Sequence, residues 1–298
     1  MYLTPNSSVM IQGSATSEAL IRAALDMKAY GTNLVACVSP GHGGEQLHSI
    51  PVFDQVEQVQ SQLGSIVTSV IWVPPYQVLD AALEAISNNI QQLVILTEGM
   101  PPLDMIHLLR KAEITDTLVV GPNCAGIIVP NQLSLGVHPS EFYTPGSVGL
   151  ISRGSTLTYE VALQLTQAQL GQSISVSIGR DLIIGSSFIQ WLQILDEDEN
   201  TEVIVLIGEA GGSGEEEAAS YIAETIDKPV VAYIAGLYAP SISPFGQGKT
   251  TATSKLIAQT PSFSTGESKK AAFKKAKIPL ADRPSKIPSL IKKVLKKK

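Results

Sequence analysis

The feature of this sequence that most restricts its fold is a repeated alternation of short apolar segments with longer segments of helical periodicity. The apolar segments lack the strict apolar–polar alternation of strands with one solvated face, so we expect them to be buried on both faces. Strands of this kind separated by helices predict a parallel sheet covered by helices on both sides. In the first half of the chain the expected strands are residues 8–12, 33–38, 66–73, 93–97 and 118–121.

The same pattern occurs twice. A stretch rich in Pro, Gly and Ser at residues 130–146 interrupts the alternation, and we interpret it as a linker. The chain of 298 residues fits two domains of roughly 150 residues each. We therefore predict two tandem, doubly wound α/β domains with parallel sheets, at residues 1–129 and 147–298. In the second domain the expected strands are residues 148–152, 174–178, 202–207 and 229–234.

Composition excludes several other classes of protein. The chain is 44% hydrophobic and 16% charged, which is unlike a disordered chain. Two cysteines exclude a disulfide scaffold and a cysteine-based zinc site, and four histidines leave little room for a His-rich metal centre. No metal site is predicted. No apolar run approaches the ~20 residues of a membrane span, and no targeting segment is visible. We therefore expect a cytoplasmic location.

Charge is unevenly distributed along the chain. In residues 269–298, eleven lysines and Arg283 against the single acid Asp282 give a net charge of +11, and the remaining 9 basic and 26 acidic residues give −17. One interpretation is a basic arm that binds nucleic acid or an anionic lipid. We favour a final strand and an amphipathic helix with a basic outer face. Apolar residues recur there at helical spacing, at Leu290, Ile291, Val294 and Leu295.

The turn after the first expected strand is a candidate phosphate-binding site. It reads Gly13-Ser14-Ala15-Thr16-Ser17, and a helix is expected to begin directly after it. The free N–H groups of a helix N-terminus, together with these hydroxyls, are suited to receive a phosphate. The alternative is a simple capped helix, with Thr16 or Ser17 as the N-cap. The G-x-G-x-x-G spacing is missing, which argues against a nicotinamide cofactor.

Two turns in the second domain repeat this arrangement. One is residues 152–156, where Arg153 adds a positive charge. The other is the Gly-rich stretch 208–214, which is followed by three glutamates at positions 215–217. We interpret these acids as ordinary helix-start residues, because negative charge is favoured at the N-terminal end of the helix dipole.

Taken together, these turns resemble the alpha subunit of succinyl-CoA synthetase (succinate–CoA ligase), an acid–thiol ligase. The resemblance extends from about residue 8 to residue 295. The matching runs include Ala29-Tyr30-Gly31-Thr32, Thr97-Glu98-Gly99, Gly121-Pro122-Asn123-Cys124, Thr156-Leu157-Thr158-Tyr159-Glu160, Ile207-Gly208-Glu209, Gly211-Gly212-Ser213 and Lys228-Pro229-Val230-Val231. It implies a Rossmann-like domain that binds coenzyme A, followed by a flavodoxin-like ligase domain. It also implies a beta-type partner subunit with an ATP-grasp fold, which alone would bind ATP or GTP and Mg²⁺.

The resemblance also implies a set of residues that contact CoA or an acyl-CoA. The residues at these positions are Thr16, Ser17, His42, Leu96, Thr97, Glu98 and Asn123. Two departures from the family pattern weaken this edge. His42 stands where the family has a lysine, and the phosphate-cradling turn has lost its two glycines and gained Glu18. A negative charge at this position opposes a pyrophosphate.

In the second domain the resemblance implies a phosphoryl-transfer site. Its expected members are Gly154, Ser155 and Thr156 for phosphate binding, Tyr159 near the acid substrate, and Glu209, which orients a phosphorylated histidine in the family. That histidine is replaced here by Gln247. An amide nitrogen is not nucleophilic, so glutamine cannot act as imidazole does. The four histidines are His42, His48, His107 and His138, and none lies in the second domain.

Three functions are consistent with these observations. The chain is an alpha-type subunit that binds CoA and pairs with a beta-type subunit, without phosphohistidine catalysis. Alternatively, it is a catalytically inactive paralogue with a regulatory role. The third possibility is a scaffold that uses residues 269–298 to bind an anionic partner. We favour the first, and expect phosphohistidine catalysis to be absent.

Overall fold

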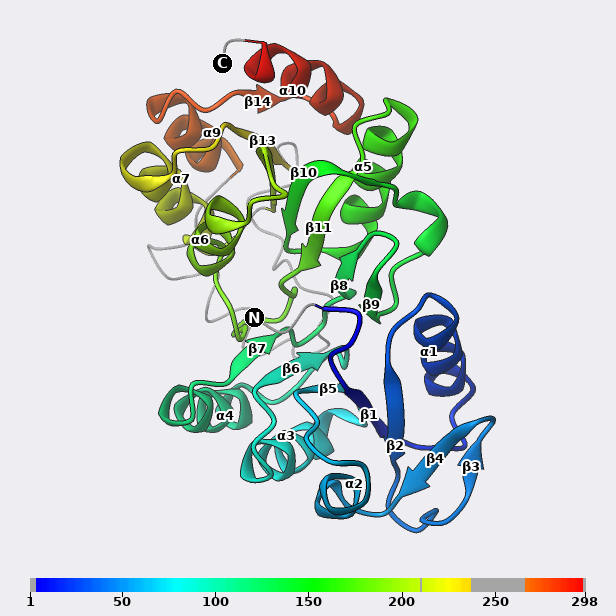
Figure 1. Cartoon of the computed structure of the whole chain (residues 1–298). Helices are drawn as coiled ribbons and strands as arrows, with labels where there is room; N and C mark the ends of the chain where they lie inside the picture. Colours follow the sequence, from blue (N-terminus) through cyan, green and yellow to red (C-terminus); the bar gives the residue numbers. More distant parts are fainter. Residues whose placement is uncertain (1–3, 210, 237–265, 297–298) are drawn as a thin grey trace. The chain divides into compact units, whose positions relative to one another are not determined.

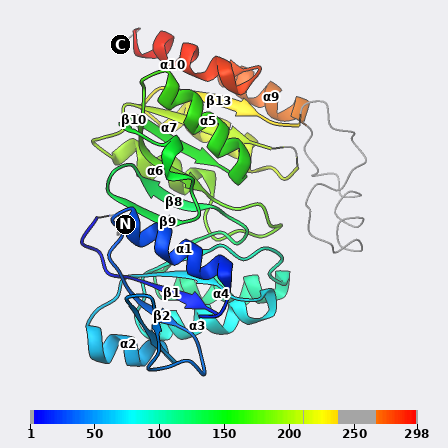
Figure 2. The ribbon, with the colours of Figure 1, turned by 90° about the vertical axis from the view of Figure 1, so that its right-hand side faces the viewer.

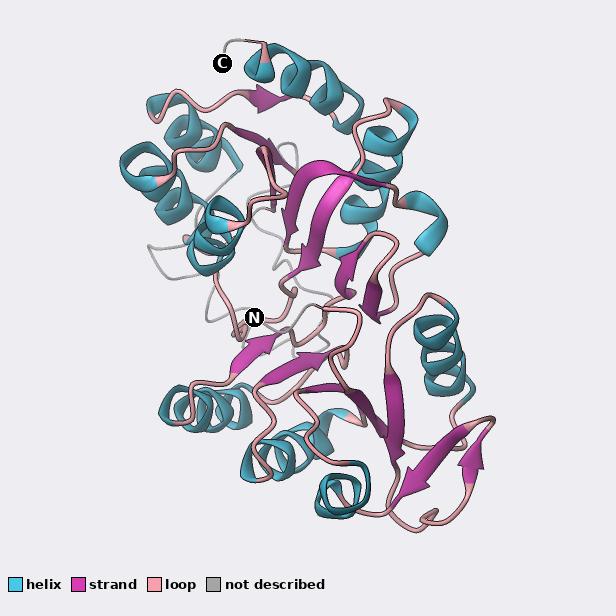
Figure 3. Ribbon diagram, in the orientation of Figure 1, coloured by secondary structure: helices cyan, strands magenta, loops and turns pink. Residues whose placement is uncertain are grey.

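The computed structural model describes residues 4–209, 211–236 and 266–296, and its chain forms two compact units (Figure 1). The first unit comprises Met1–Ser140 and Gly179–Ser186, and the second comprises Glu141–Ile178 and Ser187–Lys298. Each unit has a sheet built mainly of parallel strands with helices beside it (Figure 3). The predicted fold class, two doubly wound α/β domains, is confirmed. The division of the chain differs from the expected one, because residues 179–186 return to the first unit.

The sheet of the first unit has the strand order β3-β4-β2-β1-β5-β6-β7. Only the short edge strand β3 is antiparallel to its neighbour. The six parallel strands have the 3-2-1-4-5-6 order of dinucleotide-binding folds, in which the order reverses between β1 and β5. The strands are β1 (Val9–Gly13), β2 (Leu34–Val38), β3 (Gln46–Leu47), β4 (Ile50–Phe53), β5 (Thr68–Trp72), β6 (Gln92–Ile95) and β7 (Leu118–Val120).

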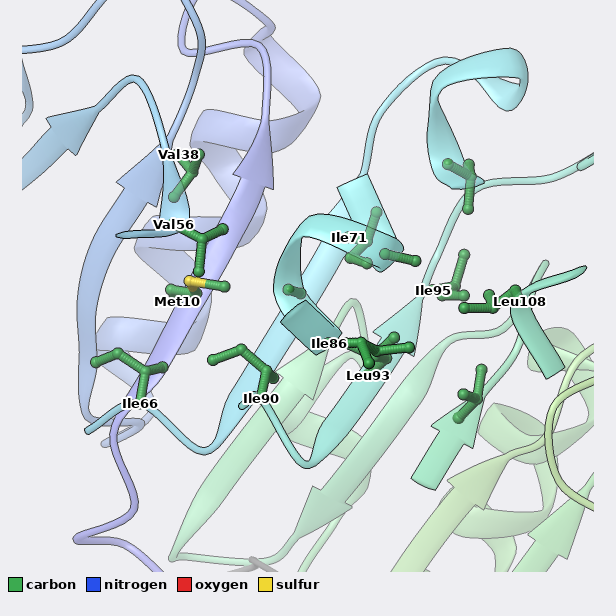
Figure 4. Packing of buried hydrophobic residues seen from close by; sticks show 14 of the residues in the cluster. Met10, Val38, Val56, Ile66, Ile71, Ile86, Ile90, Leu93, Ile95 and Leu108 are labelled. Atoms are coloured by element: carbon green, nitrogen blue, oxygen red, sulfur yellow. The ribbon is translucent and has the colours of Figure 1, made fainter. Parts of the chain in front are cut away.

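The helices of the first unit cover both faces of this sheet. They are α1 (Glu18–Ala29), α2 (Val56–Leu63), α3 (Val78–Ser87) and α4 (Pro102–Ile114). Strand residues such as Met10, Ile71 and Leu93 pack with Val56 of α2 and Leu108 of α4 in one core on a single face (Figure 4). Helix α1 contributes nothing to this core. Because right-handed crossovers run in opposite directions on either side of β1, α1 covers the other face.

The stretch at residues 130–146 is not a linker, contrary to the prediction. It contains β9 (Leu133–Gly136), the short 3₁₀ helix η2 (Ser140–Phe142) and the start of β10. With β8 (Gly126–Val129), β9 forms an antiparallel hairpin. Its turn has Pro130 followed by Asn131 at φ 59°, which is the backbone of a type II turn. The proline and the polar residues at the start of the stretch therefore build a hairpin, while the boundary between the two units, after Ser140, still lies inside it.

The second unit has five parallel strands in the order β14-β13-β12-β10-β11. This is the flavodoxin-like 2-1-3-4-5 order read from its opposite edge, and it reverses between β10 and β12. The strands are β10 (Pro145–Ser152), β11 (Gln172–Ser177), β12 (Val203–Gly208), β13 (Val230–Ile234) and β14 (Leu280–Ala281). The helices are α5 (Ser155–Gln167), α6 (Phe188–Glu197), α7 (Gly214–Thr225), α9 (Gly266–Lys275) and α10 (Ile287–Leu295).

The predicted strand and amphipathic helix near the C-terminus are confirmed as β14 and α10. Helix α10 packs against α5 and β13 (Figure 2). Its apolar face buries Ile287 and Ile291, while Lys292 and Lys293 are exposed. Lys269 is the exception to the basic outer face, because it is completely buried in α9. It is therefore not part of any surface that binds an anionic partner.

Candidate functional site

The reversal of strand order in the first sheet lies at Gly13, where β1 ends. A Cβ at this residue would lie 2.1 Å from Leu20 Cδ1 and 2.5 Å from the carbonyl oxygen of Trp72. Only glycine therefore allows α1 to begin so close to the ends of β1 and β5. Ser17 is the N-cap of α1 and its hydroxyl accepts the Leu20 N–H at 3.5 Å. The capped-helix interpretation is thus correct for Ser17.

The turn of residues 14–17 is joined to the loop that follows β2. The Ser39 hydroxyl accepts the Ala15 N–H at 3.0 Å. Two other residues of this loop are held by Asp54, which follows β4. Its Oδ1 accepts the N–H groups of Gly41 at 2.7 Å and of Gly43 at 3.0 Å. This loop carries His42. The structure thereby brings the turn of Thr16 and Ser17 and the loop of His42 to the same edge.

His42 is only partly exposed in this loop. Its Nδ1 lies 3.2 Å from Glu45 Oε1, so one ring nitrogen is directed toward a carboxylate. The hydroxyl of Thr16 lies 2.9 Å from that of Ser14, and Thr16 is exposed. Glu18 is exposed in the first turn of α1. Hydrogen-bond donors, such as the Thr16 hydroxyl, and the negative charge of Glu18 are therefore close together in sequence at this edge.

The turns after β6 and β7 are held together by a residue that sequence analysis did not select. Asp181 Oδ2 accepts the Gly99 N–H at 2.9 Å, and its Oδ1 accepts Asn123 Nδ2–H at 3.0 Å. The Asn123 N–H in turn donates to the Thr97 carbonyl at 2.8 Å. Thr97 is buried and its hydroxyl donates to the Val73 carbonyl at 2.7 Å, so it is fixed beside the end of β5.

The remaining members of this edge differ in exposure. Leu96 is buried and its N–H donates to the carbonyl of Ile71 at 3.0 Å, whereas Glu98 is exposed. Cys124 lies behind the same turn, and burial raises the pKa of its thiol to about 12. A thiol with so high a pKa is not a nucleophile near neutral pH.

In the second unit, the order reverses between the ends of β10 and β12. The hydroxyls of Ser152 and Thr158 both donate to the carbonyl of Gly154, which fixes the N-cap position of α5. Ser155 is the first residue of α5, and the exposed Thr156 follows it. The predicted phosphate-binding residues therefore lie at a helix N-terminus. Tyr159 is on the same helix and is half-buried.

Glu209 lies at the end of β12, and its N–H donates to Glu215 Oε1 at 2.9 Å. Glu215 is completely buried and pairs with Lys269. The interpretation of the three glutamates as ordinary helix-start residues is therefore wrong for Glu215, since an acid that only favours the helix dipole stays solvated. Glu217 accepts the Ser213 hydroxyl at 2.7 Å and fits that interpretation.

Gln247, the expected replacement of the phosphohistidine, lies outside the described residues. Within residues 4–209, 211–236 and 266–296, no group of three or more His, Cys, Asp or Glu side chains is arranged to hold a metal ion. Over the same described parts, no helix combines the length and apolar content that crossing a bilayer requires.

The two units correspond to two known families of domain. Residues 4–99 match the CoA binding domain family, and residues 151–276 match the CoA-ligase family. The fold and its edges thus define a protein with a CoA-binding domain and a CoA-ligase domain.

Relatives of similar length narrow this class. The alpha subunit of succinate–CoA ligase [ADP-forming] from Staphylococcus aureus (strain Mu50) is 40% identical over 263 residues, covering 86% of this chain and 86% of the relative. The same subunit from Staphylococcus epidermidis (strain ATCC 12228) is 38% identical with the same coverage. The chain belongs to the succinate–CoA ligase alpha-subunit family.

Solved structures agree with the fold. An ATP citrate lyase from Methanothrix soehngenii, solved with citrate and coenzyme A, superposes with a TM-score of 0.85 at 19% identity. The superposition covers 100% of this chain and 51% of the lyase chain. A dinucleotide-forming acetyl-coenzyme A synthetase from Ca. Korarchaeum cryptofilum gives 0.71 at 22% identity, covering 93% of this chain and 58% of that protein. At these identities the likeness concerns the fold alone.

Proposed function

We propose that this chain binds CoA, or an ester of CoA, at the carboxyl edge of its first sheet. The observation that supports this best is the convergence of three turns, residues 14–17, 39–44 and 96–99, where the strand order reverses. Ligands of doubly wound sheets bind in the crevice at such a reversal. Two hydrogen bonds link these turns and strands: Ala15 N–H to Ser39, and the Thr97 hydroxyl to Val73.

The chemistry of this edge suits the phosphates of CoA. The N–H groups of the first turn of α1, with the hydroxyls of Thr16 and Ser17, provide donors and the positive end of the helix dipole. His42 adds a ring nitrogen, since only Nδ1 is directed at Glu45. Glu18 repels a nearby pyrophosphate. We therefore expect CoA to bind more weakly here than at a turn that has the two glycines of the family pattern and lacks Glu18.

Thermal unfolding tests this assignment. A ligand that binds only the folded chain stabilises it by about 2.7 kcal/mol at a concentration 100 times its Kd. CoA should therefore raise the midpoint of unfolding of the first unit, and His42→Ala should reduce the rise. An unfolding midpoint that CoA leaves unchanged up to millimolar concentrations excludes the assignment.

We further propose that a beta-type ATP-grasp subunit is the partner and that ATP or GTP and Mg²⁺ bind there. The names of the relatives, which are alpha subunits, support this pairing. Purification of the tagged chain together with a co-expressed beta-type subunit tests it. Separate elution of the two proteins at micromolar concentration contradicts it.

The second unit then presents an edge for a phosphoryl or carboxylate group without a covalent carrier. Gly154, Ser155 and Thr156 supply N–H groups and hydroxyls. Tyr159 lies on the same helix, Glu209 follows the neighbouring strand β12, and Gln247 takes the place of the phosphorylated histidine. Incubation with labelled ATP and the beta-type partner should leave no acid-labile phosphate on this chain. Phosphohistidine in the second unit would overturn this proposal.

An inactive scaffold with an anionic partner is the second candidate, and exposed lysines on α9 and α10 favour it. The exposed cations include Lys274, Lys275, Lys292, Lys293 and Lys296. Because α10 packs on α5 and β13, its deletion would disturb the core. Changing Lys292, Lys293 and Lys296 to glutamate is the cleaner test. Salt-sensitive binding to anionic vesicles that survives these changes excludes α10 as the binding surface, and a wild-type chain that does not bind such vesicles excludes the scaffold role.

A further inference from the structure

Asp54 joins the loop that carries His42 to the first sheet. It directly follows β4, which pairs with β2 in parallel, so it lies beside the end of β2 where this loop begins (Figure 1). Its Oδ1 accepts the N–H groups of Gly41 at 2.7 Å and of Gly43 at 3.0 Å. Its own N–H donates to Gln58 Oε1 at 3.0 Å, in the first turn of α2. One half-buried residue is therefore fixed by β4 and α2 while its carboxylate holds the loop.

The backbone N–H groups of residues 41–45 all have partners within the protein. Asp54 accepts two of them. Backbone carbonyls accept the other three: His42 donates to Ser39 at 3.1 Å, Gly44 to Val52 at 3.0 Å, and Glu45 to His42 at 3.1 Å. Each backbone N–H has a single proton to donate. This loop therefore has to bind an anion through a side chain, unlike the glycine-rich loops that surround a phosphate with free N–H groups.

His42 is the side chain of this loop that is suited to the task. Its Nδ1 lies 3.2 Å from Glu45 Oε1, and over the described parts of the chain no hydrogen bond reaches Nε2. A protonated imidazole donates from both nitrogens, so it can bridge a carboxylate and a phosphate. The loop begins at Ser39, whose hydroxyl accepts the Ala15 N–H at 3.0 Å, so it lies against the turn that precedes α1.

The composition of the loop makes an external contact necessary. Three of the four residues 41–44 are glycine, and glycine loses more conformational freedom on folding than any other residue. Position 43 also has to be glycine for the carboxylate to come close, because a Cβ there would lie 2.4 Å from Asp54 Oδ2. Gly43 thus leaves the space that the Asp54 carboxylate occupies, and Asp54 limits the conformations that the glycines allow.

We propose that Asp54 is a positioning residue for CoA binding, which holds residues 41–43 so that His42 meets a phosphate of CoA. Asp54 does not touch the ligand, and its negative charge alone would oppose a phosphate. The inference rests on the proposed CoA site of the first unit. It adds the residue that orders one of the three turns of that site.

Calorimetric titration with CoA separates positioning from charge. Asp54→Asn removes the charge but keeps an oxygen that can accept both N–H groups, whereas Asp54→Ala removes the charge and the acceptor. We expect a Kd within twofold of the wild type for Asp54→Asn. For Asp54→Ala we expect a Kd about tenfold higher, the change that a loop-ordering cost of about 1.4 kcal/mol produces. Wild-type affinity in Asp54→Ala, or an equal change of affinity in the two variants in either direction, overturns the positioning role.

A double-variant cycle tests whether Asp54 acts through His42. In a His42→Ala chain, Asp54→Ala should change the Kd no further, because the loop then has no donor side chain to position. Additive losses contradict the assignment. Glu57→Ala is the matched control, since Glu57 is an exposed acid in the first turn of α2. Its Kd should stay within twofold of the wild type, and a loss as large as that of Asp54→Ala would overturn the role.

Amide hydrogen exchange without ligand distinguishes a failure of this inference from a failure of the CoA assignment. Asp54→Ala should accelerate exchange at Gly41 and Gly43 about tenfold, while His42→Ala leaves it unchanged. Unchanged exchange in Asp54→Ala overturns the positioning role even if CoA binds. A wild-type chain that binds no CoA overturns the CoA assignment, while the exchange data still decide whether Asp54 orders the loop.

A second variant keeps the inference testable if Asp54→Ala does not fold. Gly43→Ala keeps the carboxylate but places a Cβ where Asp54 Oδ2 lies, so it should also separate the loop from Asp54. We expect faster exchange at Gly41 and weaker CoA binding. Wild-type exchange together with wild-type CoA affinity in Gly43→Ala contradicts the positioning role.

Discussion

Replacement of Asp181 probes the CoA-binding edge most specifically. Its carboxylate accepts two hydrogen bonds, from Gly99 N–H at 2.9 Å and Asn123 Nδ2–H at 3.0 Å. A hydrogen bond to a charged group contributes about 1.5–3 kcal/mol, and less where water competes. Asp181→Ala removes both bonds and releases the turn of residues 96–99. If CoA must then order this turn at a cost of about 1.4 kcal/mol, its Kd rises about tenfold.

A graded series makes this prediction sharper. Asp181→Asn keeps one acceptor, so we expect a smaller loss of about threefold. Isothermal calorimetry with CoA measures each Kd, and thermal unfolding checks that each variant is folded. Asp282→Ala, an exposed acid in the second unit, is the control. CoA affinity within twofold of the wild type in Asp181→Ala would refute the reasoning.

Three further outcomes are expected. Gly13→Ala should destabilise the first unit by about 1–3 kcal/mol in urea unfolding, since its Cβ would lie 2.5 Å from the Trp72 carbonyl; unchanged stability contradicts this. Burial raises the pKa of Cys37 and Cys124 to about 12, so neither thiol should react with DTNB at pH 8 before unfolding, and rapid native labelling would be inconsistent with that burial. Burial lowers the pKa of His138 from 6.5 to about 4. The unfolded chain therefore takes up a proton first, and stability is lost as pH falls from about 6.5 toward 4, by at most about 1.4 kcal/mol per unit. His138→Gln should flatten this slope between pH 7 and pH 5, and an unchanged slope counts against the assignment.

Elements with a continuous apolar run, or with apolar residues at helical spacing over several turns, were predictable from the sequence. Strands β1, β2, β5, β6 and β7 of the first sheet, strands β10 to β13 of the second, and helices α1 and α10 are of this kind. Strand β4 and helix α2 were not predicted. The two-residue strand β3 is too short to show any period. The sequence at Pro130 and Asn131 predicts a linker where the structure has a hairpin, because turn residues and linker residues have the same composition.

The residues that hold the candidate sites together were harder to predict. Asp181 binds Gly99 across 82 positions of sequence, and Lys269 reaches Glu215 across 54. Hydrophobic periodicity describes only neighbours within one element, so it contains no signal for such pairs. The Gly-Arg-Asp run that includes Asp181 followed a predicted strand, and this position at a sheet edge was the only local indication.

We propose that the first unit is a CoA site and not a general dinucleotide site. Its 3-2-1-4-5-6 strand order is shared with domains that bind NAD. The most direct measurement is therefore calorimetric titration of the wild-type chain with CoA and, separately, with NAD. We expect saturable binding of CoA with one site per chain and no heat with NAD. Saturable binding of NAD, or the absence of any CoA binding at millimolar concentration, would contradict this proposal.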